Sequence, residues 1–241
     1  MLDWLRRDPR TPPTIALAGR ELPIVVRRLE HARRLTMRLA PDGSEVRISM
    51  PRWGRMVEAV RFAASRHEWL ERQLIAIPVP SPLQAGSMIR FRGQSLMLAH
   101  DPAARRAPMC DGETLQVGGA AASLESRLRR WLQGQAKGLL TTDVADYCRA
   151  AGLPVSPLAL SAAKRRWGSC AASGAIRINW RLIMAPDFVR RSVVAHEVAH
   201  LVHFNHSPAF HACLKGLFDG DLAAADSWLK REGRSLYQPF G

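Results

Sequence analysis

The sequence predicts an α+β protein with an N-terminal β-rich subdomain and a C-terminal core of helices around a small sheet. Two observations lead to this fold class. Apolar and polar residues alternate over much of the first hundred residues, which is the period of strands. From residue 121 onward apolar residues recur at helical spacing. The intervening residues 101–119 are rich in Pro and Gly, so we place the boundary there and expect subdomains 1–119 and 120–241.

The first elements form a hairpin with one solvent-facing side. Residues 22–29 are expected to be a strand, and residues 34–40 and 46–50 alternate between apolar and polar side chains. Pro41-Asp42-Gly43 supplies the turn between the last two.

One helix and two strands are expected next. Residues 55–77 carry apolar side chains at helical spacing, and Pro78 ends the helix. Short strands follow at 88–91 and 95–99, and residues 101–119 are expected to be irregular.

The C-terminal half is expected to contain four helices and two strands. A long helix at 121–151 ends at Gly152, and a later helix begins at Pro186 and Asp187. The Pro186 helix is expected to reach about Phe204. Two strands, at 158–163 and 175–182, are joined by the loop 164–174. A shorter helix is capped by Ser207-Pro208, and a last helix covers 222–231.

The composition is that of an ordinary folded protein, with 241 residues, 47% of them hydrophobic and 23% charged. No apolar run approaches the roughly 18 residues of a membrane span, and Met1–Arg10 lacks the apolar region of a secretory signal. We therefore expect no membrane association and a cytoplasmic location. The four cysteines contain no Cys-x-x-Cys pair, which argues against disulfides and a thiolate zinc site.

The net charge of +14 favours nonspecific association with DNA or RNA. Arg supplies 31 of the 35 basic residues, which is also what a GC-rich coding bias produces.

The string His196-Glu197-Val198-Ala199-His200 points to a metal site. On a helix His196 and His200 lie about 40° apart, so both imidazoles can reach one zinc ion at about 2.0 to 2.1 Å. Glu197 projects on the same side without being a ligand, where it can deprotonate a zinc-bound water. The alternative is a core helix that carries two histidines by chance.

A third histidine is needed because two nitrogens leave zinc underliganded, whereas three ligands and a water form a catalytic site. His206 follows His200 by six residues and precedes the Ser207-Pro208 helix start, so a tight turn can return it to the metal. His203 and His211 compete for this role. We expect His203 to line the cleft instead, and His211 to be structural or exposed. These three expected ligands predict one zinc ion per chain.

A second string, Lys164 to Cys170, lies in the loop before the metal helix. Arg166 is suited to bind a carboxylate or an oxyanion, and Gly168 permits close backbone approach. The alternative is a basic turn with a packed Trp167. Cys170 is not expected to be a nucleophile, since the histidines that would activate it are committed to the metal. The oxyanion donor stays open between Arg166 and His203.

These strings, together with Ile176 to Leu182, Ala185-Pro186, Asn205-His206-Ser207 and Trp228-Leu229-Lys230, resemble the YgjP-like zinc metallopeptidase family. The family is a minigluzincin-type relative of the SprT-like and WLM-domain peptidases, with an N-terminal β-rich part and a zincin-like core. The resemblance implies zinc on His196, His200 and His206, and Glu197 as general base. It also implies that Arg166 to Cys170, including Trp167 and Ser169, borders the substrate cleft.

The SprT-like and WLM-domain relatives act on proteins crosslinked to DNA. One departure is visible, because His211 follows Phe210 where the family has an aromatic pair.

We therefore expect a zinc metalloendopeptidase that hydrolyses protein or peptide substrates, with possible action near DNA. The alternative is a nucleic-acid-binding protein with a structural zinc and no turnover. A closed structural site has four protein ligands and needs no glutamate beside the metal, so Glu197 favours the enzyme.

Overall fold

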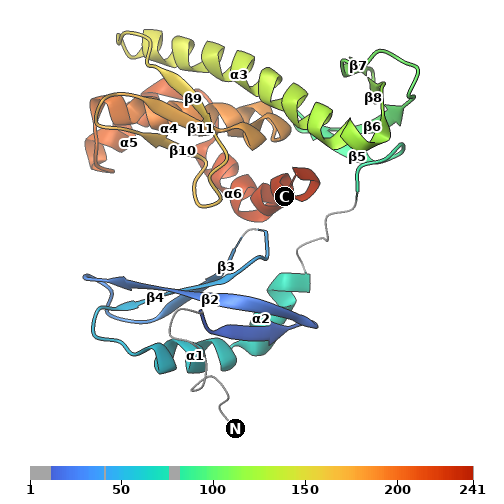
Figure 1. Cartoon of the computed structure of the whole chain (residues 1–241). Helices are drawn as coiled ribbons and strands as arrows, with labels where there is room; N and C mark the ends of the chain where they lie inside the picture. Colours follow the sequence, from blue (N-terminus) through green and yellow to red (C-terminus); the bar gives the residue numbers. More distant parts are fainter. Residues whose placement is uncertain (1–11, 41, 76–81, 241) are drawn as a thin grey trace. The chain divides into compact units, whose positions relative to one another are not determined.

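The computed structural model describes residues 12–40, 42–75 and 82–240 and divides the chain into two compact units, 1–79 and 80–241 (Figure 1). The expected boundary at residue 119 differs from this division by forty residues. The reason is that Ile89, Leu98 and Leu115 share one apolar core with Leu124 and Leu128 of the following helix. The N-terminal segment 1–10, Pro41 of the expected turn and the expected helix end at 76–78 lie outside the described residues.

The first unit contains a four-stranded sheet of order β1-β2-β4-β3. Its strands are β1 (Thr14–Leu17), β2 (Arg20–Leu29), β3 (Thr36–Leu39) and β4 (Val46–Pro51). β3 and β4 pair antiparallel, which confirms the expected hairpin, and β2 pairs parallel with β4.

Two helices, α1 (Met56–Ala64) and α2 (His67–Ile75), pack on this sheet, so the prediction of one continuous helix is wrong (Figure 1). The hydroxyl of Ser65 donates to the Phe62 carbonyl at 2.9 Å, which offers the backbone an alternative to the helical hydrogen bond at the break.

The second unit begins with a four-stranded sheet of order β5-β6-β8-β7. Its strands are β5 (Met88–Phe91), β6 (Gln94–His100), β7 (Met109–Asp111) and β8 (Thr114–Val117). The prediction that 101–119 is irregular is therefore wrong for its second half. Leu115 and Val117 alternate and are buried, but this short pattern is hidden among turn residues.

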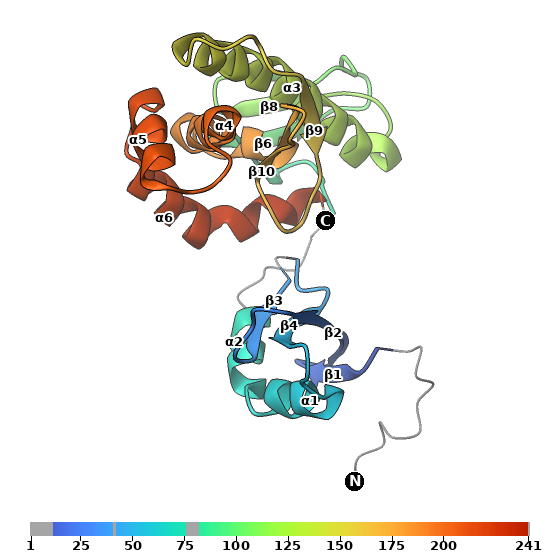
Figure 2. The same ribbon diagram turned by 90° about the vertical axis from the view of Figure 1, so that its left-hand side faces the viewer.

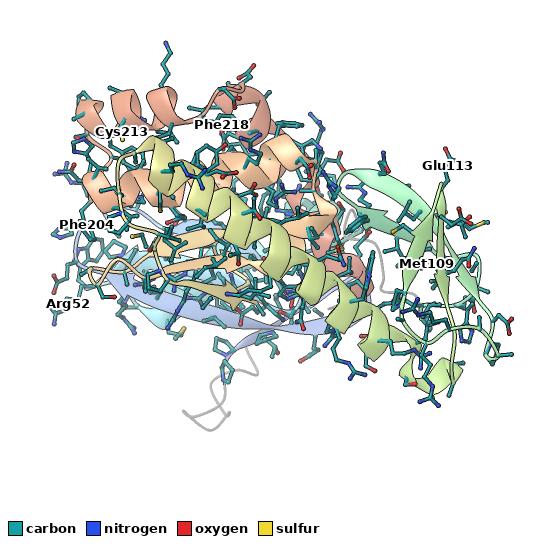
Figure 3. All side chains as sticks on the ribbon, turned by 90° about the horizontal axis from the view of Figure 1, so that it is seen from above. Arg52, Met109, Glu113, Phe204, Cys213 and Phe218 are labelled. Atoms are coloured by element: carbon teal, nitrogen blue, oxygen red, sulfur yellow. The ribbon has the colours of Figure 1, made fainter. Side chains whose placement is uncertain are left out.

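The long helix α3 (Leu124–Ala150) confirms the prediction for this segment, and a short 3-10 helix, Ala121–Ser123, precedes it. Gly152 has a φ of +69°, as expected for a helix end. Seen from above, α3 crosses the unit and joins its two sheets (Figure 3). Leu128, Leu132 and Leu140 on its inner face are fully buried.

A three-stranded sheet of order β10-β11-β9 follows. β9 (Leu158–Ser161) and β11 (Ile176–Asn179) pair parallel, and β10 (Gly168–Cys170), which the sequence did not predict, pairs antiparallel with β11. β10 is thus an edge strand. β11 is shorter than expected because Asn179 caps a 3-10 helix, Trp180–Met184, by accepting the Arg181 N–H.

Three helices and a 3-10 segment complete the unit. They are α4 (Asp187–Val202), α5 (Pro208–Leu217), α6 (Leu222–Glu232) and Gly233–Phe240. α4 contacts α3, α5 and α6 and lies among them (Figure 2). Its Arg190 bonds Asp143 of α3 at 2.7 Å, with both side chains buried. This ion pair fixes α4 against α3.

The α+β class is confirmed. No helix in the described part of the chain has the length and apolarity that a bilayer crossing requires.

Candidate active site

Three histidines converge at the C-terminal end of α4. His196 and His200 lie one turn apart on this helix, and His206 comes from the loop before α5. One ring nitrogen of each lies within 4.8 Å of the others, and the two Nε2 atoms of His196 and His206 are 3.1 Å apart. The structure therefore brings together the three residues that the sequence singled out as metal ligands.

The backbone of His203 sets up this arrangement. Its extended conformation (φ −133°, ψ 107°) ends α4 and turns the chain back. Its carbonyl lies 3.1 Å from Nδ1 of His200. A carbonyl only accepts, so Nδ1 carries the proton and the lone pair of His200 is on Nε2. The sequence suggested a role for the His203 side chain and missed this carbonyl.

The ring of Phe210 packs against all three imidazoles. It is fully buried, and its ring centroid lies 5.0 Å from that of His196, 4.6 Å from His200 and 4.8 Å from His206. The Ser207 hydroxyl accepts the Phe210 N–H at 3.3 Å and so caps α5. This cap was predicted, but the contact of Phe210 with all three rings was not, because it depends on the return of the chain after His203.

The electrostatics leave His196 neutral near pH 7. Burial, helped by the neighbouring His200 and His206, lowers the pKa of His196 to about 4. A neutral imidazole offers a lone pair, which is the form that binds a metal.

Glu197 lies beside this cluster and is only 5% exposed. Burial raises the pKa of Glu197 to about 7, against the opposing effects of the Arg166 charge and of a backbone hydrogen bond from Cys170. Its Oε2 is buried and has no hydrogen-bond partner among the described residues. A buried carboxylate oxygen without a partner is costly, so this atom is suited to accept a hydrogen bond from a water or a ligand.

Gly168 of β10 makes room for Glu197. A Cβ built on Gly168 would lie 2.6 Å from Cγ of Glu197 and would contact its Oε1 more closely still, so any larger residue would displace the carboxylate. The expected close backbone approach at Gly168 is confirmed. Because side chains alternate along a strand, the Cβ of Ser169 points to the other face of the sheet, away from Glu197.

The other predicted residues are placed as follows. Arg166 is exposed, and its charge acts on Glu197. Trp167 is half-buried against Tyr237, with ring centroids 5.6 Å apart. Within the described residues, the three-histidine cluster includes neither His203 nor His211, whose ring lies 6.4 Å from that of His206.

Three imidazoles with a buried glutamate beside them are typical of one class, the metallopeptidases. The model of the family described as YgjP-like, metallopeptidase domain, matches residues 33–232. Because this match covers most of the chain, the protein belongs to the YgjP-like metallopeptidase family. Searches of the curated proteins and of the solved structures each found no match.

Membership implies a metal-dependent hydrolase that acts on proteins. The residues present fit a metal such as zinc. Three imidazole nitrogens converge within one ion's reach, and the unpartnered Oε2 of Glu197 lies beside them.

Proposed function

We propose that this protein is a zinc metalloendopeptidase with a zincin-like core, in which His196, His200 and His206 hold one zinc ion and Glu197 is the general base. The observation that carries the proposal is the buried Oε2 of Glu197, which lacks a partner next to three convergent imidazoles. When bound, zinc polarises the peptide carbonyl and lowers the pKa of water.

Glu197 performs the proton transfers in this proposal. Its carboxylate takes a proton from the attacking water and passes it to the leaving amine. Burial raises the pKa of Glu197 in the metal-free chain, and a base whose pKa lies near the working pH suits both steps, because it can bind and release the proton. Gly168 leaves the space in which the carboxylate is held.

The substrate is proposed to bind in an extended form along β10. This strand ends the three-stranded sheet, so the backbone groups on its outer side, other than the Cys170 N–H that bonds Glu197, are available for pairing. Because backbone hydrogen bonds do not depend on the side chains, this mode of binding accepts many substrate sequences.

Arg166 is the stronger candidate for stabilising the oxyanion. Its charge already acts on Glu197, whereas His203 contributes its backbone carbonyl to His200. In this proposal Trp167 forms a wall of the cleft, and Ser169 contributes through its backbone.

The alternative, a nucleic-acid-binding protein with a structural zinc, fits the site less well. A closed zinc site uses four protein ligands, and the cluster found among the described residues offers three. The charge of +14 supports nonspecific DNA association as an added property of the enzyme. Action near DNA would be supported by faster cleavage of a DNA-bound protein than of the same protein free, at equal salt, with a gain that shrinks when Arg165 and nearby surface arginines become Gln. Equal rates would reject action near DNA.

The proposed mechanism is tested by Glu197→Gln, which keeps the size of the side chain and removes the base. Peptide hydrolysis is expected to fall at least about a hundredfold while zinc content is unchanged. Glu125→Gln, on the exposed side of α3, is the matched control and should hydrolyse at the parent rate. Undiminished hydrolysis by Glu197→Gln would disprove the role of Glu197.

A further inference from the structure

A cavity of about 620 Å³ lies at the start of α3, separate from the histidine cluster. Its walls come from the loop between β6 and β7, the turn that precedes α3 and the first two turns of α3. This end of α3 lies beside the β5–β8 sheet (Figure 1). None of the described residues that line the cavity belongs to the three-histidine site, so the cavity needs an explanation of its own.

The cavity gathers positive charge. Three arginines line it, Arg106, Arg127 and Arg130, and no acidic residue does within the described part of the chain. The side-chain hydrogen bonds of Arg127 and Arg130 go to uncharged oxygen atoms. Like charges that share a concave site repel one another and attract an anion. The ligand that suits this site is therefore negatively charged.

The guanidinium group of Arg127 is fixed in place before any ligand binds. Its Nη1 donates to the Ser123 hydroxyl at 2.6 Å, and its Nη2 donates to the Ala120 carbonyl at 2.9 Å. These acceptors orient the group without cancelling its charge, and each nitrogen has a second hydrogen to donate to a ligand. A Cβ built on Gly119 would lie 3.0 Å from Nη1 of Arg127 and 3.2 Å from Cγ of Arg106, so both arginines lie against this glycine.

Three guanidinium groups fit a phosphate better than a carboxylate. A phosphate monoester has three terminal oxygens and up to two negative charges, whereas a carboxylate has two oxygens and one charge. Arginine presents paired N–H groups that match such oxygens. Arg106 and Arg130 are exposed, so the cavity is open to a ligand from solvent.

The rest of the cavity is suited to an organic group attached to the phosphate. Its volume is in the range of pockets that hold small organic ligands and exceeds what a phosphate ion needs. Trp131, one helical turn after Arg127, forms part of the wall together with Pro108. The Trp131 ring packs on Phe91 with centroids 4.9 Å apart, which holds it in position. An aromatic side chain beside arginines is the combination that binds the base and phosphate of a nucleotide.

We propose that this cavity binds a nucleotide, with the phosphate held by Arg106, Arg127 and Arg130 and the base against Trp131. The nucleotide is either free or one unit of a single strand, since both present the same phosphate and base. The site differs from the nonspecific attraction that the net charge of +14 produces, because it depends on particular side chains. The inference does not rest on the proposed peptidase function.

The test measures binding of two fluorescent probes to the full chain by anisotropy at one salt concentration. One probe is adenosine triphosphate labelled on its ribose, and the other is a labelled single-stranded oligothymidylate. Arg106→Gln and Arg130→Gln should each weaken binding about tenfold, the loss of one charge-assisted hydrogen bond. Both side chains are exposed, so neither substitution is expected to disturb the fold.

Arg105→Gln is the matched control. Arg105 precedes Arg106 in the same exposed loop and has the same charge, but its side chain does not line the cavity. This substitution should weaken binding less than about twofold. Dependence of the triphosphate probe on Arg106 supports a free nucleotide, and the same dependence for the oligothymidylate alone supports a strand. Equal effects of Arg105→Gln and Arg106→Gln, or no binding of either probe, overturn the proposal.

Competition tests the contact with the base. Adenosine monophosphate should displace the bound probe at least about tenfold more effectively than inorganic phosphate, because stacking on an aromatic ring adds to the phosphate contacts. Trp131→Leu should remove this advantage. Equal displacement by adenosine monophosphate and by phosphate in the parent protein would overturn the assignment to a nucleotide, whether or not Trp131→Leu folds.

Discussion

The histidine cluster is held by groups that are not themselves metal ligands. The His203 carbonyl fixes the tautomer of His200, and Phe210 supports all three rings from below. Such supporting contacts reduce the freedom of the ligands before a metal binds. His206 lies in an exposed loop rather than on α4, and of these two supporting groups it contacts Phe210.

Replacing His206 by Ala is therefore expected to weaken zinc binding sharply. The parent should carry about one zinc per chain after purification, because three nitrogens and water complete its coordination. Metal analysis and competition with a chelator measure the effect. His211→Ala, five residues on and outside the cluster, serves as the control. Normal occupancy in His206→Ala together with loss in His203→Ala would identify a different third ligand.

The raised pKa of Glu197 predicts a pH dependence of stability in the metal-free protein. The folded-state pKa of about 7 exceeds the ordinary value of 4.5, so the folded protein favours the protonated acid. The contribution of this group to stability is greatest below pH 4.5 and is lost as the pH rises to about 7. The parent should lose about 2 kcal/mol relative to Glu197→Gln between pH 5 and pH 8.

Urea unfolding in the presence of a chelator measures this difference. His196 is present in both proteins, so its own titration largely cancels in the comparison. Glu125→Gln should follow the parent at every pH. A gap between parent and Glu197→Gln that does not change with pH would show that burial does not perturb this carboxylate.

At the scale of elements, α4 carries most of the site, because His196, Glu197 and His200 all lie on it. Its C-terminal half carries the two histidines and Glu197, and its N-terminal half is tied to α3 by the pair Arg190 and Asp143. Asp187 at its start also pairs with Arg190 and with Arg92 of the β5–β6 turn. Burial alone would raise the pKa of Asp187, but the hydrogen bond from Arg92 and the charge of Arg190 outweigh it, and the net pKa is lowered.

Removing Asp143 is expected to destabilise the protein strongly. The Arg190 and Asp143 side chains are 3% and 9% exposed, so Asp143→Ala leaves a buried guanidinium with only Asp187. The expected cost is about 3 kcal/mol in the free energy of unfolding. Asp146→Ala, one turn along α3, is the control, since its pair with Arg149 is solvent-exposed and should contribute less than about 1 kcal/mol. Equal effects of the two substitutions in urea unfolding would contradict this account.

At the scale of the whole molecule, each unit has its own apolar core. One core draws its buried residues from Leu17 to Leu74, and the other from Ile89 to Phe240. The three histidines, Glu197 and the cavity of about 500 Å³ that His196 and Glu197 help to line all belong to the second unit.

A chain of residues 80–241 is accordingly expected to fold cooperatively and to bind about one zinc ion. Its core is complete, because no buried residue of this cluster comes from the first unit. Thermal unfolding and metal analysis of this fragment provide the check. A fragment that is unfolded, or that binds no zinc while the full chain does, would show that the second unit needs the first.

Local patterns explain what could be predicted from the sequence. The spacing of His196, Glu197 and His200 places three side chains on one side of a helix whatever surrounds it. Ser207-Pro208 and Gly152 mark helix ends through contacts within one turn. The strands with regular alternation were predicted for the same reason. The split between α1 and α2 was missed because the pattern of apolar residues runs through it.

Only the tertiary structure decided the features that depend on distant residues. β10 is three residues long and exists as a strand because β11 pairs with it. The contact of Gly168 with Glu197, the packing of Phe210 and the cavity beside His196 and Glu197 each join segments separated by loops. The sequence by itself thus determined the chemistry that one helix can carry. Which groups surround that helix was decided by long-range packing, which leaves no periodic signal in the chain.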